Sequence, residues 1–236
     1  MEIIEHPIVF YLLGIPVRDT VVYTWLVMAI VIIGVILIEK IKPNLLSTLL
    51  DAIIGIIGSV LDEDNLNPYI PLLGSLMVFI FFSSAASIIP GVKSPTSDIN
   101  TTIALALIVF FAVHYYGIRK KGFIGYLKEF ATPIFLFPLE IISQFSRTIS
   151  LALRLFGNIL GGDLIFAIVF SIIPMFIPVA VAGLGLFTGI LQAYVFTILA
   201  SLYIGSAVAI NEAESSKKES KKQIKQKRKE LANERS

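Results

Sequence analysis

The chain has 236 residues, of which 56% are hydrophobic and 15% are charged, and its mean hydropathy is +0.85. A soluble domain carries roughly 25% charged residues, so this composition indicates a membrane protein. The formal net charge of +2 depends on residues 211–236, which hold nine Lys or Arg and five Asp or Glu, and this confinement of basic residues to one terminal run argues against a nucleic-acid-binding domain.

Three apolar segments of ordinary length lie in the first half of the chain. Residues 20–38, 69–89 and 101–116 each reach roughly the 20 residues that a helix needs to cross a hydrocarbon core of ~30 Å. We predict a transmembrane helix over each of them. Residues 1–19 then form an external segment.

A fourth segment, residues 43–61, lies between the first two spans and has a different pattern. Its apolar pairs are separated by Ser47, Thr48, Asp51 and Ser59. A helix with this alternation has one apolar and one polar face, and such helices lie in the membrane interface. We therefore predict an amphipathic interfacial helix here.

The last two apolar segments are unusually long. Residues 138–170 and 179–210 each exceed thirty residues, which is roughly 50 Å of helix at 1.5 Å per residue and too long for an upright span. Pro174 and Pro178 lie in the connection and favour a break. The predicted fold is an all-α integral membrane domain over residues 20–210, with three ordinary transmembrane helices, one interfacial helix and a C-terminal hairpin of two long tilted helices.

Basic residues in the connections predict the orientation. With the N-terminus outside, two basic residues lie outside and fifteen lie inside, nine of them in the tail of residues 211–236, so the C-terminus is expected in the cytoplasm. The two outside are Arg18 and Lys93, and those inside before the tail are Lys40, Lys42, Arg119, Lys120, Lys121 and Lys128. The Lys-rich tail is expected to be solvated and disordered, with contacts to anionic lipid or to other protein chains as the alternative.

Four charged residues remain inside the fourth apolar span. They are Glu140, Arg147, Arg154 and Asp163. A charge at mid-membrane costs at least ~2.5–3.5 kcal/mol, so each is a functional hypothesis. Glu140 and Arg147, near the cytoplasmic end, can instead form an interfacial pair that snorkels toward water. Arg154 lies midway along the segment with no acidic residue within one helical turn.

The polar residues of this segment share one helical face with Arg154. An arginine guanidinium stays protonated at physiological pH, so Arg154 cannot relay protons but can keep a partner carboxylate ionised. On the facing helix, Gln192 shares a face with the small residues Gly185, Thr188 and Gly189, which permit close helix approach. Simple interhelical hydrogen bonding is the alternative role for Gln192. The polar face of the first helix comprises Glu140, Ser143, Gln144, Arg147, Ser150, Arg154, Asn158, Gly161 and Gly162.

Several runs in this region carry a family resemblance. Residues 150–160 read SLALRLFGNIL and are followed by Asp163 and Leu164, and residues 191–196 read LQAYVF. This pattern resembles subunit a of the F-type ATP synthase, the stator channel of its membrane sector. Two further runs also resemble family members: residues 95–102 match the segment before the third span, and residues 183–188 match the chloroplast and cyanobacterial branch. The resemblance covers about residues 68–205.

The resemblance implies a role for each of seven residues. Arg154 matches the essential arginine that faces the carboxylate on the rotating ring of subunit c and separates two aqueous half-channels. Asn158 and Gln192 match polar partners close to that arginine. The remaining matches are Glu140 and Ser150 in the cytoplasmic half-channel, and Asp163 and Asp98 toward the outer side.

The resemblance also implies partners and a location. The expected partners are the ring of subunit c, the peripheral-stalk subunit b, the rest of the ATP synthase and the lipid bilayer, and the expected ion is the proton. We expect a bacterial plasma (inner) membrane, with a thylakoid membrane as the alternative.

The chain departs from the family pattern at two positions. Asp163 stands where many members have Glu. Gly185 stands where some bacterial members have His, so an outer histidine relay is not expected.

Two other function classes fit less well. A stand-alone secondary transporter or channel is the alternative reading, but it would normally show internal repeats and more than five spans. An integral-membrane enzyme needs clustered acids or a nucleophile with a base. The chain has no Cys and only His6 and His114, far apart in sequence. We therefore expect no catalytic activity, no metal site and no cofactor.

Overall fold

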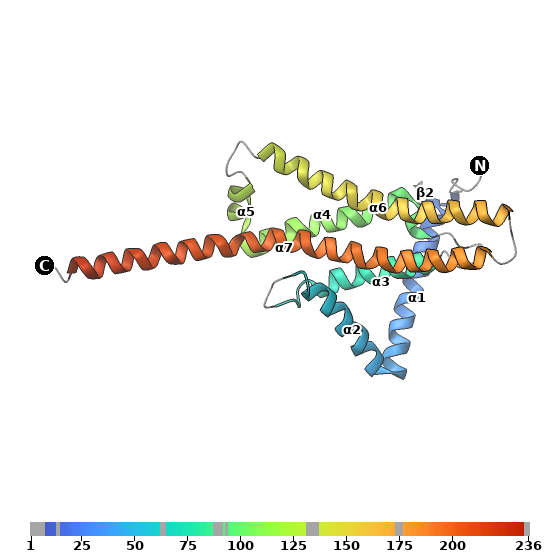
Figure 1. Ribbon diagram of the computed structural model, residues 1–236, viewed down its shortest axis with the longest axis horizontal. Coiled ribbons are helices and arrows are strands. Elements are labelled where there is room, and N and C mark those ends of the chain that lie inside the picture. Colours follow the sequence, from blue (N-terminus) through green and yellow to red (C-terminus); the bar gives the residue numbers. More distant parts are fainter. Residues whose placement is uncertain are drawn as a thin grey trace.

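The computed structural model of the chain describes residues 8–12, 15–61, 65–86, 92, 94–130, 137–172 and 177–233. These residues are almost entirely helical (Figure 1), which confirms the prediction of an all-α membrane protein. Four helices are long and apolar enough to cross a membrane: α1 (Asp19–Ile41), α4 (Ile99–Lys121), α6 (Phe137–Ile172) and the Ala180–Val208 part of α7 (Ile177–Asn233).

A short β-hairpin precedes the first helix. Strand β1 (Ile8–Leu12) pairs antiparallel with β2 (Ile15–Arg18), which the sequence analysis did not predict. Its IVFYL and IPVR sequences are rich in the β-branched and aromatic residues that strands favour. Helix α1 follows directly, and its first residue, Asp19, places a carboxylate at the positive end of the helix dipole.

Helices α1, α2 (Pro43–Gly58) and α3 (Ile70–Ala86) follow one another with short connections. Pro43 occupies the first turn of α2, where its missing N–H leaves no hydrogen bond unmade. In Figure 1, α1 leaves the bundle and α2 returns toward it, so the two form a V. The described part of α3 has 17 residues, about 25 Å of helix, and is shorter than the predicted span of residues 69–89.

Helix α4 has well-defined ends. Asp98 is its N-cap, and the side chain accepts a hydrogen bond from the backbone N–H of Asn100. Gly122, with φ of 73°, ends the helix in the left-handed conformation that glycine adopts without strain. The short helix α5 (Phe123–Phe130), which was not predicted, folds back so that Tyr126 covers Gly117. A Cβ on Gly117 would lie 2.6 Å from Cε2 of Tyr126, so this approach needs glycine.

Helices α6 and α7 run antiparallel as a long hairpin (Figure 1), as the sequence predicted. Residues 173–176 of the connection, which include Pro174, lie outside the described residues, as does Lys93. Helix α7 differs from the prediction at its far end, because it continues to Asn233 instead of ending near residue 210. The tail is rich in Lys, Glu, Gln and Ala, which are strong helix formers.

The buried core lies between α3, α4, α6 and α7. Helix α3 packs on α7, and α4 packs on both members of the hairpin. Small residues such as Ala152, Ala193 and Ala200 let these helices approach closely. The large buried side chains include Leu73, Leu76, Ile80, Val109, Leu151, Leu155, Phe196 and Ile204.

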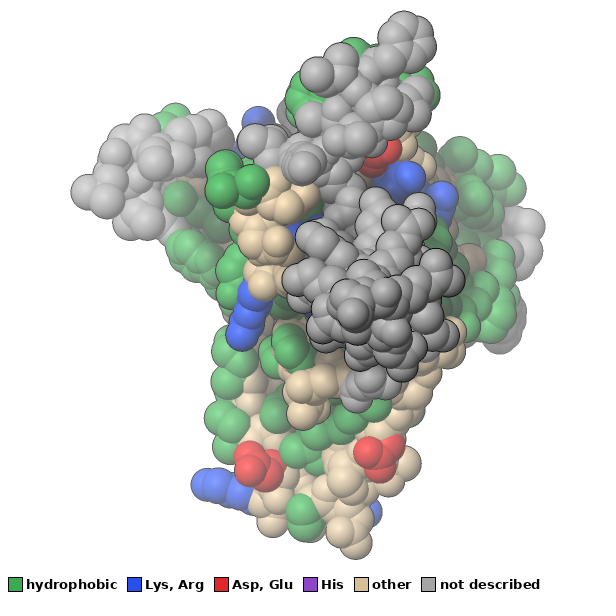
Figure 2. Space-filling view, turned by 90° about the vertical axis from the view of Figure 1, so that its left-hand side faces the viewer, with side chains coloured by type: hydrophobic (Ala, Val, Ile, Leu, Met, Phe, Trp, Pro, Cys, Tyr) green, Lys and Arg blue, Asp and Glu red, His purple; other side chains and the backbone are tan. Residues whose placement is uncertain are grey.

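The outer surface is largely apolar. Only 6% of the most apolar window of α1 is buried, and its exposed side chains include Trp25, Ile32 and Ile33. In Figure 2 hydrophobic side chains are spread over the coloured part of the visible face, and charged side chains lie at its lower end and also in its middle and upper parts. A surface of this kind is stable in contact with lipid or with other membrane helices.

Candidate functional site

Arg154 lies midway along α6 on the outside of the bundle. Its side chain is exposed, whereas the neighbouring Leu151, Ala152 and Leu155 are buried in the core. Among the described residues the guanidinium makes no hydrogen bond and no ion pair. The fold therefore presents a permanent positive charge on an apolar surface, where its counter-charge has to come from another molecule.

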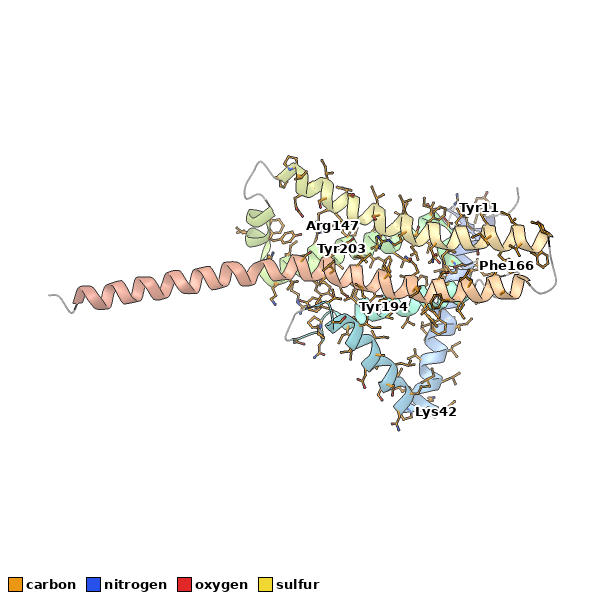
Figure 3. All side chains as sticks on the ribbon, in the orientation of Figure 1. Tyr11, Lys42, Arg147, Phe166, Tyr194 and Tyr203 are labelled. Atoms are coloured by element: carbon orange, nitrogen blue, oxygen red, sulfur yellow. The ribbon has the colours of Figure 1, made fainter. Side chains whose placement is uncertain are left out.

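The predicted pair of Glu140 and Arg147 is not formed. The Glu140 carboxylate accepts a hydrogen bond of 3.0 Å from Nε2 of Gln144, one helical turn away. Arg147 instead lies over the ring of Tyr203 on α7, with its Cζ 5.6 Å from the ring centroid (Figure 3). A cation over an aromatic face is attracted by the ring quadrupole, so Arg147 links the two helices of the hairpin on the N-terminal side of Arg154.

Asn158 and Gln192 occupy different environments. Asn158 donates from Nδ2 to the backbone carbonyl of Thr188, at 3.4 Å, and so links α6 to α7. Gln192 is 7% exposed, and its Nε2 has no hydrogen-bond partner among the described residues. Neither amide bonds to Arg154. Both amides were expected to lie close to the arginine, but neither forms a hydrogen bond with it.

Gln192 lies one turn of α7 beyond a close contact with α3. Three residues earlier, Gly189 packs so tightly on α3 that an added Cβ would clash with the Cβ of Ser84 and would lie 3.1 Å from its Oγ. Ser83, also on α3, has a buried hydroxyl without a hydrogen-bond partner among the described residues. The small residues of α7 were predicted to share one face toward α6. In the structure they contact two different helices: Gly189 contacts α3 and Thr188 contacts α6.

Asp163 lines a small cavity between α6 and α7. The cavity has a volume of about 50 Å³, and Asn158, Gly185 and Thr188 also line it. Asp163 lies nine residues beyond Arg154, about 14 Å along the helix. Asp163 was predicted to serve an ion path on the far side of Arg154 from Glu140. The cavity is open space beside Asp163 on that side of the arginine.

Asp98 is buried and has both hydrogen-bond partners and an ion-pair partner. It is 4% exposed and accepts hydrogen bonds from Thr20 Oγ1 at 3.0 Å and from the N–H and Nδ2 of Asn100, each at 2.9 Å. The guanidinium of Arg18 lies 3.9 Å from its Oδ2. These contacts join α1 to the start of α4. They favour a structural role over the predicted role in ion access.

Two neighbours of the site were missed by the sequence analysis. Tyr203 lies 56 residues from Arg147, and Ser84 lies 105 residues from Gly189, so no local spacing connects them. Both are ordinary residues for an apolar helix. Among the described residues, no group of three or more His, Cys, Asp or Glu is placed to hold a metal ion.

The chain is similar in sequence to known proteins over most of its length. Residues 21–205 match the family described as ATP synthase A chain. The chain is 42% identical to "ATP synthase subunit a 2" of Picosynechococcus sp., over 92% of this chain and 97% of the relative. It is 40% identical to "ATP synthase subunit a 2" of Bradyrhizobium sp., over 85% and 93%, and 43% identical to "ATP synthase subunit a" of Helicobacter pylori, over 72% and 77%.

Proposed function

Because the chain belongs to the ATP synthase A chain family, we propose that it is the ion-translocating stator subunit of an F-type ATP synthase membrane sector. The observation that carries the mechanism is the exposed Arg154 on α6, a helix of apolar composition, without an ion pair among the described residues. Family membership disfavours the stand-alone transporter. The subunit itself carries no catalytic step and acts by guiding ions to and from a rotor.

Arg154 faces the ring of subunit c in this proposal. A ring carboxylate that passes the guanidinium is held ionised, because a nearby positive charge favours the charged form of an acid. The carboxylate gives up its ion on one side of Arg154 and takes up a new ion on the other. Each charge that crosses is driven by ~2.3 kcal/mol per 100 mV of membrane potential. A fixed cation between the two paths prevents ions from crossing without turning the ring.

Two groups of side chains on α6 serve the two paths. Glu140, Gln144 and Ser150 lie on the N-terminal side of Arg154 and are assigned to the cytoplasmic path. Asp163 lies on the other side, toward the outside. Asn158 ties this region to α7 through the carbonyl of Thr188, and Gln192 is a buried amide of α7. Asp98 is assigned to structure.

We further propose the partners and the orientation. The ring of subunit c covers the exposed face of α6 around Arg154, and the peripheral-stalk subunit b and lipid cover other apolar surfaces. The N-terminus lies outside and the C-terminal tail lies in the cytoplasm of a bacterial plasma membrane, or in the corresponding compartment of a thylakoid. The proton is the expected ion.

Replacement of Arg154 tests this function. In inverted membrane vesicles that contain the complete ATP synthase, we expect Arg154→Ala and Arg154→Gln to abolish ATP-driven ion pumping, because the ring carboxylate loses the charge that ionises it. The complex should still assemble, since Arg154 contributes no contact to the described fold. Pumping is measured with a pH-sensitive dye, and assembly with purified membranes.

Arg119 supplies a matched control. It is an exposed arginine in the last turn of α4, so Arg119→Gln removes the same charge outside the proposed ion path. We expect this variant to pump normally. Normal coupling in an assembled Arg154→Ala complex would overturn the proposed function.

A further inference from the structure

The C-terminal part of α7 extends beyond the bundle. The part of this helix that is apolar enough to span a membrane ends at Val208, whereas the helix itself continues to Asn233. In Figure 1 the extension stands clear of the other helices. Residues 209–233, named the tail helix here, are not used by the proposed ion path. They contain the densest run of charge in the chain.

Most basic residues of the tail helix share one side of it. Residues 217–229 hold eight Lys or Arg and one Glu. At about 100° per residue, seven of the eight basic residues occupy one sector of the helix, about 140° wide. Glu212, Glu219 and Glu230 lie on the other side, whereas Glu214 lies within the sector but ahead of the run. The seven residues, named the basic sector, are Lys217, Lys218, Lys221, Lys222, Lys225, Arg228 and Lys229.

The spacing within the basic sector calls for an anionic partner. Several of its lysines are four positions apart, and like charges at that spacing destabilise a helix. A negatively charged surface beside the basic sector offsets this repulsion, which the glutamates on the other side of the helix leave in place. The pairs are Lys217 with Lys221, Lys218 with Lys222, Lys221 with Lys225, and Lys225 with Lys229.

The composition of the tail helix fits a lipid surface better than a protein partner. Interfaces between proteins are enriched in Arg and aromatic residues and depleted of Lys. Seven of the eight basic residues in residues 217–229 are Lys, and residues 209–236 contain no aromatic residue. A lysine ammonium is a compact point charge without the fork that pairs with one carboxylate. A lysine cluster directly after a transmembrane helix is typical of contact with anionic lipid headgroups.

Aromatic and basic side chains gather at the end of the bundle where the tail helix begins. Helix α4 ends there with Arg119, Lys120 and Lys121. On α7, the ring of Tyr203 lies beneath the Arg147 guanidinium (Figure 3). Aromatic and basic residues at helix ends are typical of the membrane–water interface. The tail helix therefore starts close to a membrane surface.

The direction of α7 keeps the basic sector near that surface. Lys217 and Lys229 follow Val208 by about 14 Å and 32 Å of helix, at 1.5 Å per residue. On an upright helix, most of the sector would lie beyond the ~8–10 Å over which charges act in physiological salt. In Figure 1, however, α1 runs across α7, so a steep α1 leaves α7 at a shallow angle to the membrane. The tail helix then runs along the surface.

We propose that the tail helix lies along the cytoplasmic surface of the membrane and binds anionic phospholipid headgroups through its basic sector. Because α7 tethers the tail helix beside the surface, the contact forms at a high effective concentration and needs no apolar anchor of its own. It holds the cytoplasmic end of α7, which packs on α3, α4 and α6, to the membrane. The proposal rests on the proposed orientation but on no step of ion translocation.

The test uses the complete ATP synthase in vesicles of phosphatidylcholine alone or of phosphatidylcholine with phosphatidylglycerol. A fluorescent dye is attached at Ser220→Cys, outside the basic sector, in a complex without other accessible cysteines. A lipid that carries a quencher on its headgroup reports contact between the dye and the membrane. We expect quenching in the vesicles that contain phosphatidylglycerol and little in the neutral ones. Added salt should release the tail helix, because exposed charges are screened.

Two single substitutions separate the basic sector from net charge. Lys225→Gln removes a charge from the middle of the sector, and Lys227→Gln removes the same charge two residues away, outside it. At the salt concentration that releases half of the unaltered tail, we expect Lys225→Gln to lower the ratio of bound to free tail about fivefold, the factor given by ~1 kcal/mol per basic residue. Lys227→Gln should change this ratio little. Joint replacement of Lys218, Lys222 and Lys225 by Gln should lower it about a hundredfold.

Three results would overturn the proposal. Equal quenching in neutral and anionic vesicles would show that the contact does not depend on headgroup charge. Absence of quenching in anionic vesicles at low salt would show that the tail helix does not reach the surface. An equal fall in Lys225→Gln and Lys227→Gln would remove the role of the basic sector. The quenching needs no turnover, so it is independent of Arg154, whose replacement is judged by loss of pumping.

Discussion

At the scale of single residues, the surroundings of a charge separate a structural role from a functional one. Asp98 and Arg154 both lie in or next to apolar helices. Asp98 is buried and accepts hydrogen bonds from Thr20 and Asn100 beside the Arg18 guanidinium, so its partners lie within the fold. Arg154 is exposed and unpaired among the described residues. In the proposed function a rotor carboxylate compensates its charge.

This contrast predicts the effect of replacing Asp98. We expect Asp98→Ala to destabilise the subunit by about 2–4 kcal/mol, because it removes the N-cap of α4 and leaves the buried Thr20 hydroxyl without its partner. Asp98→Asn keeps a capping oxygen and should cost less. Thermal denaturation of the purified complex measures the difference. An Asp98→Asn variant that is fully stable but has a shifted ion dependence would instead place Asp98 in the ion path.

At the scale of elements, α3 and α7 approach each other closely one turn before Gln192. Gly189 and Ser84 bring the two backbones together, and the Gln192 side chain on the next turn of α7 is buried. Its Nε2 has no hydrogen-bond partner among the described residues. A buried amide is costly unless water or a further group satisfies it.

Enlarging Gly189 should disturb this contact. We expect Gly189→Ala to destabilise the subunit by roughly 1–3 kcal/mol through overpacking against Ser84. Ser84→Gly in the same chain should restore stability, because it removes the atoms that clash. Gly183→Ala, in open space on the same helix, is the control. Melting temperatures of the four complexes give the comparison, and an equal loss in Gly189→Ala and in the double variant would show that the contact is not the cause.

At the scale of the whole molecule, the helices do not share one direction. In Figure 1, α1 runs across the long axis of the α6–α7 hairpin, so α1 and the hairpin cannot both stand upright in a bilayer. An upright α1, whose 23 residues suit the membrane thickness, leaves the hairpin tilted. The tilt agrees with the length of α6, whose 36 residues exceed an upright span. It also brings a long stretch of α6 into reach of a rotor in the membrane plane.

The orientation can be tested directly because the chain has no natural cysteine. We place single cysteines by Tyr11→Cys, at an exposed position of the N-terminal hairpin, and by Ser220→Cys in the tail. A membrane-impermeant maleimide added to intact cells should label the first and not the second. Inverted vesicles should give the opposite pattern. Labelling of Ser220→Cys from outside would reverse the assigned topology.

Much of this protein could be predicted from its sequence because the membrane imposes simple rules. Long apolar runs give the spanning helices, basic connections predict their orientation, and a charge such as Arg154 within an apolar run is visible without a structure. The N-terminal hairpin, α5 and the helical tail were missed. They are short or highly charged, and apolar periodicity carries no signal for them.

The membrane class, the long hairpin and the position of Arg154 along it follow from the sequence, because each depends on residues that are close in the chain. The fold was needed to show that Asp98 lies beside Arg18, that Arg147 faces Tyr203 instead of Glu140, that Gly189 packs on Ser84, and that Gly185 leaves a cavity beside Asp163. These contacts join helices far apart in sequence. Their partners are chosen by packing, which a pattern along one helix does not contain.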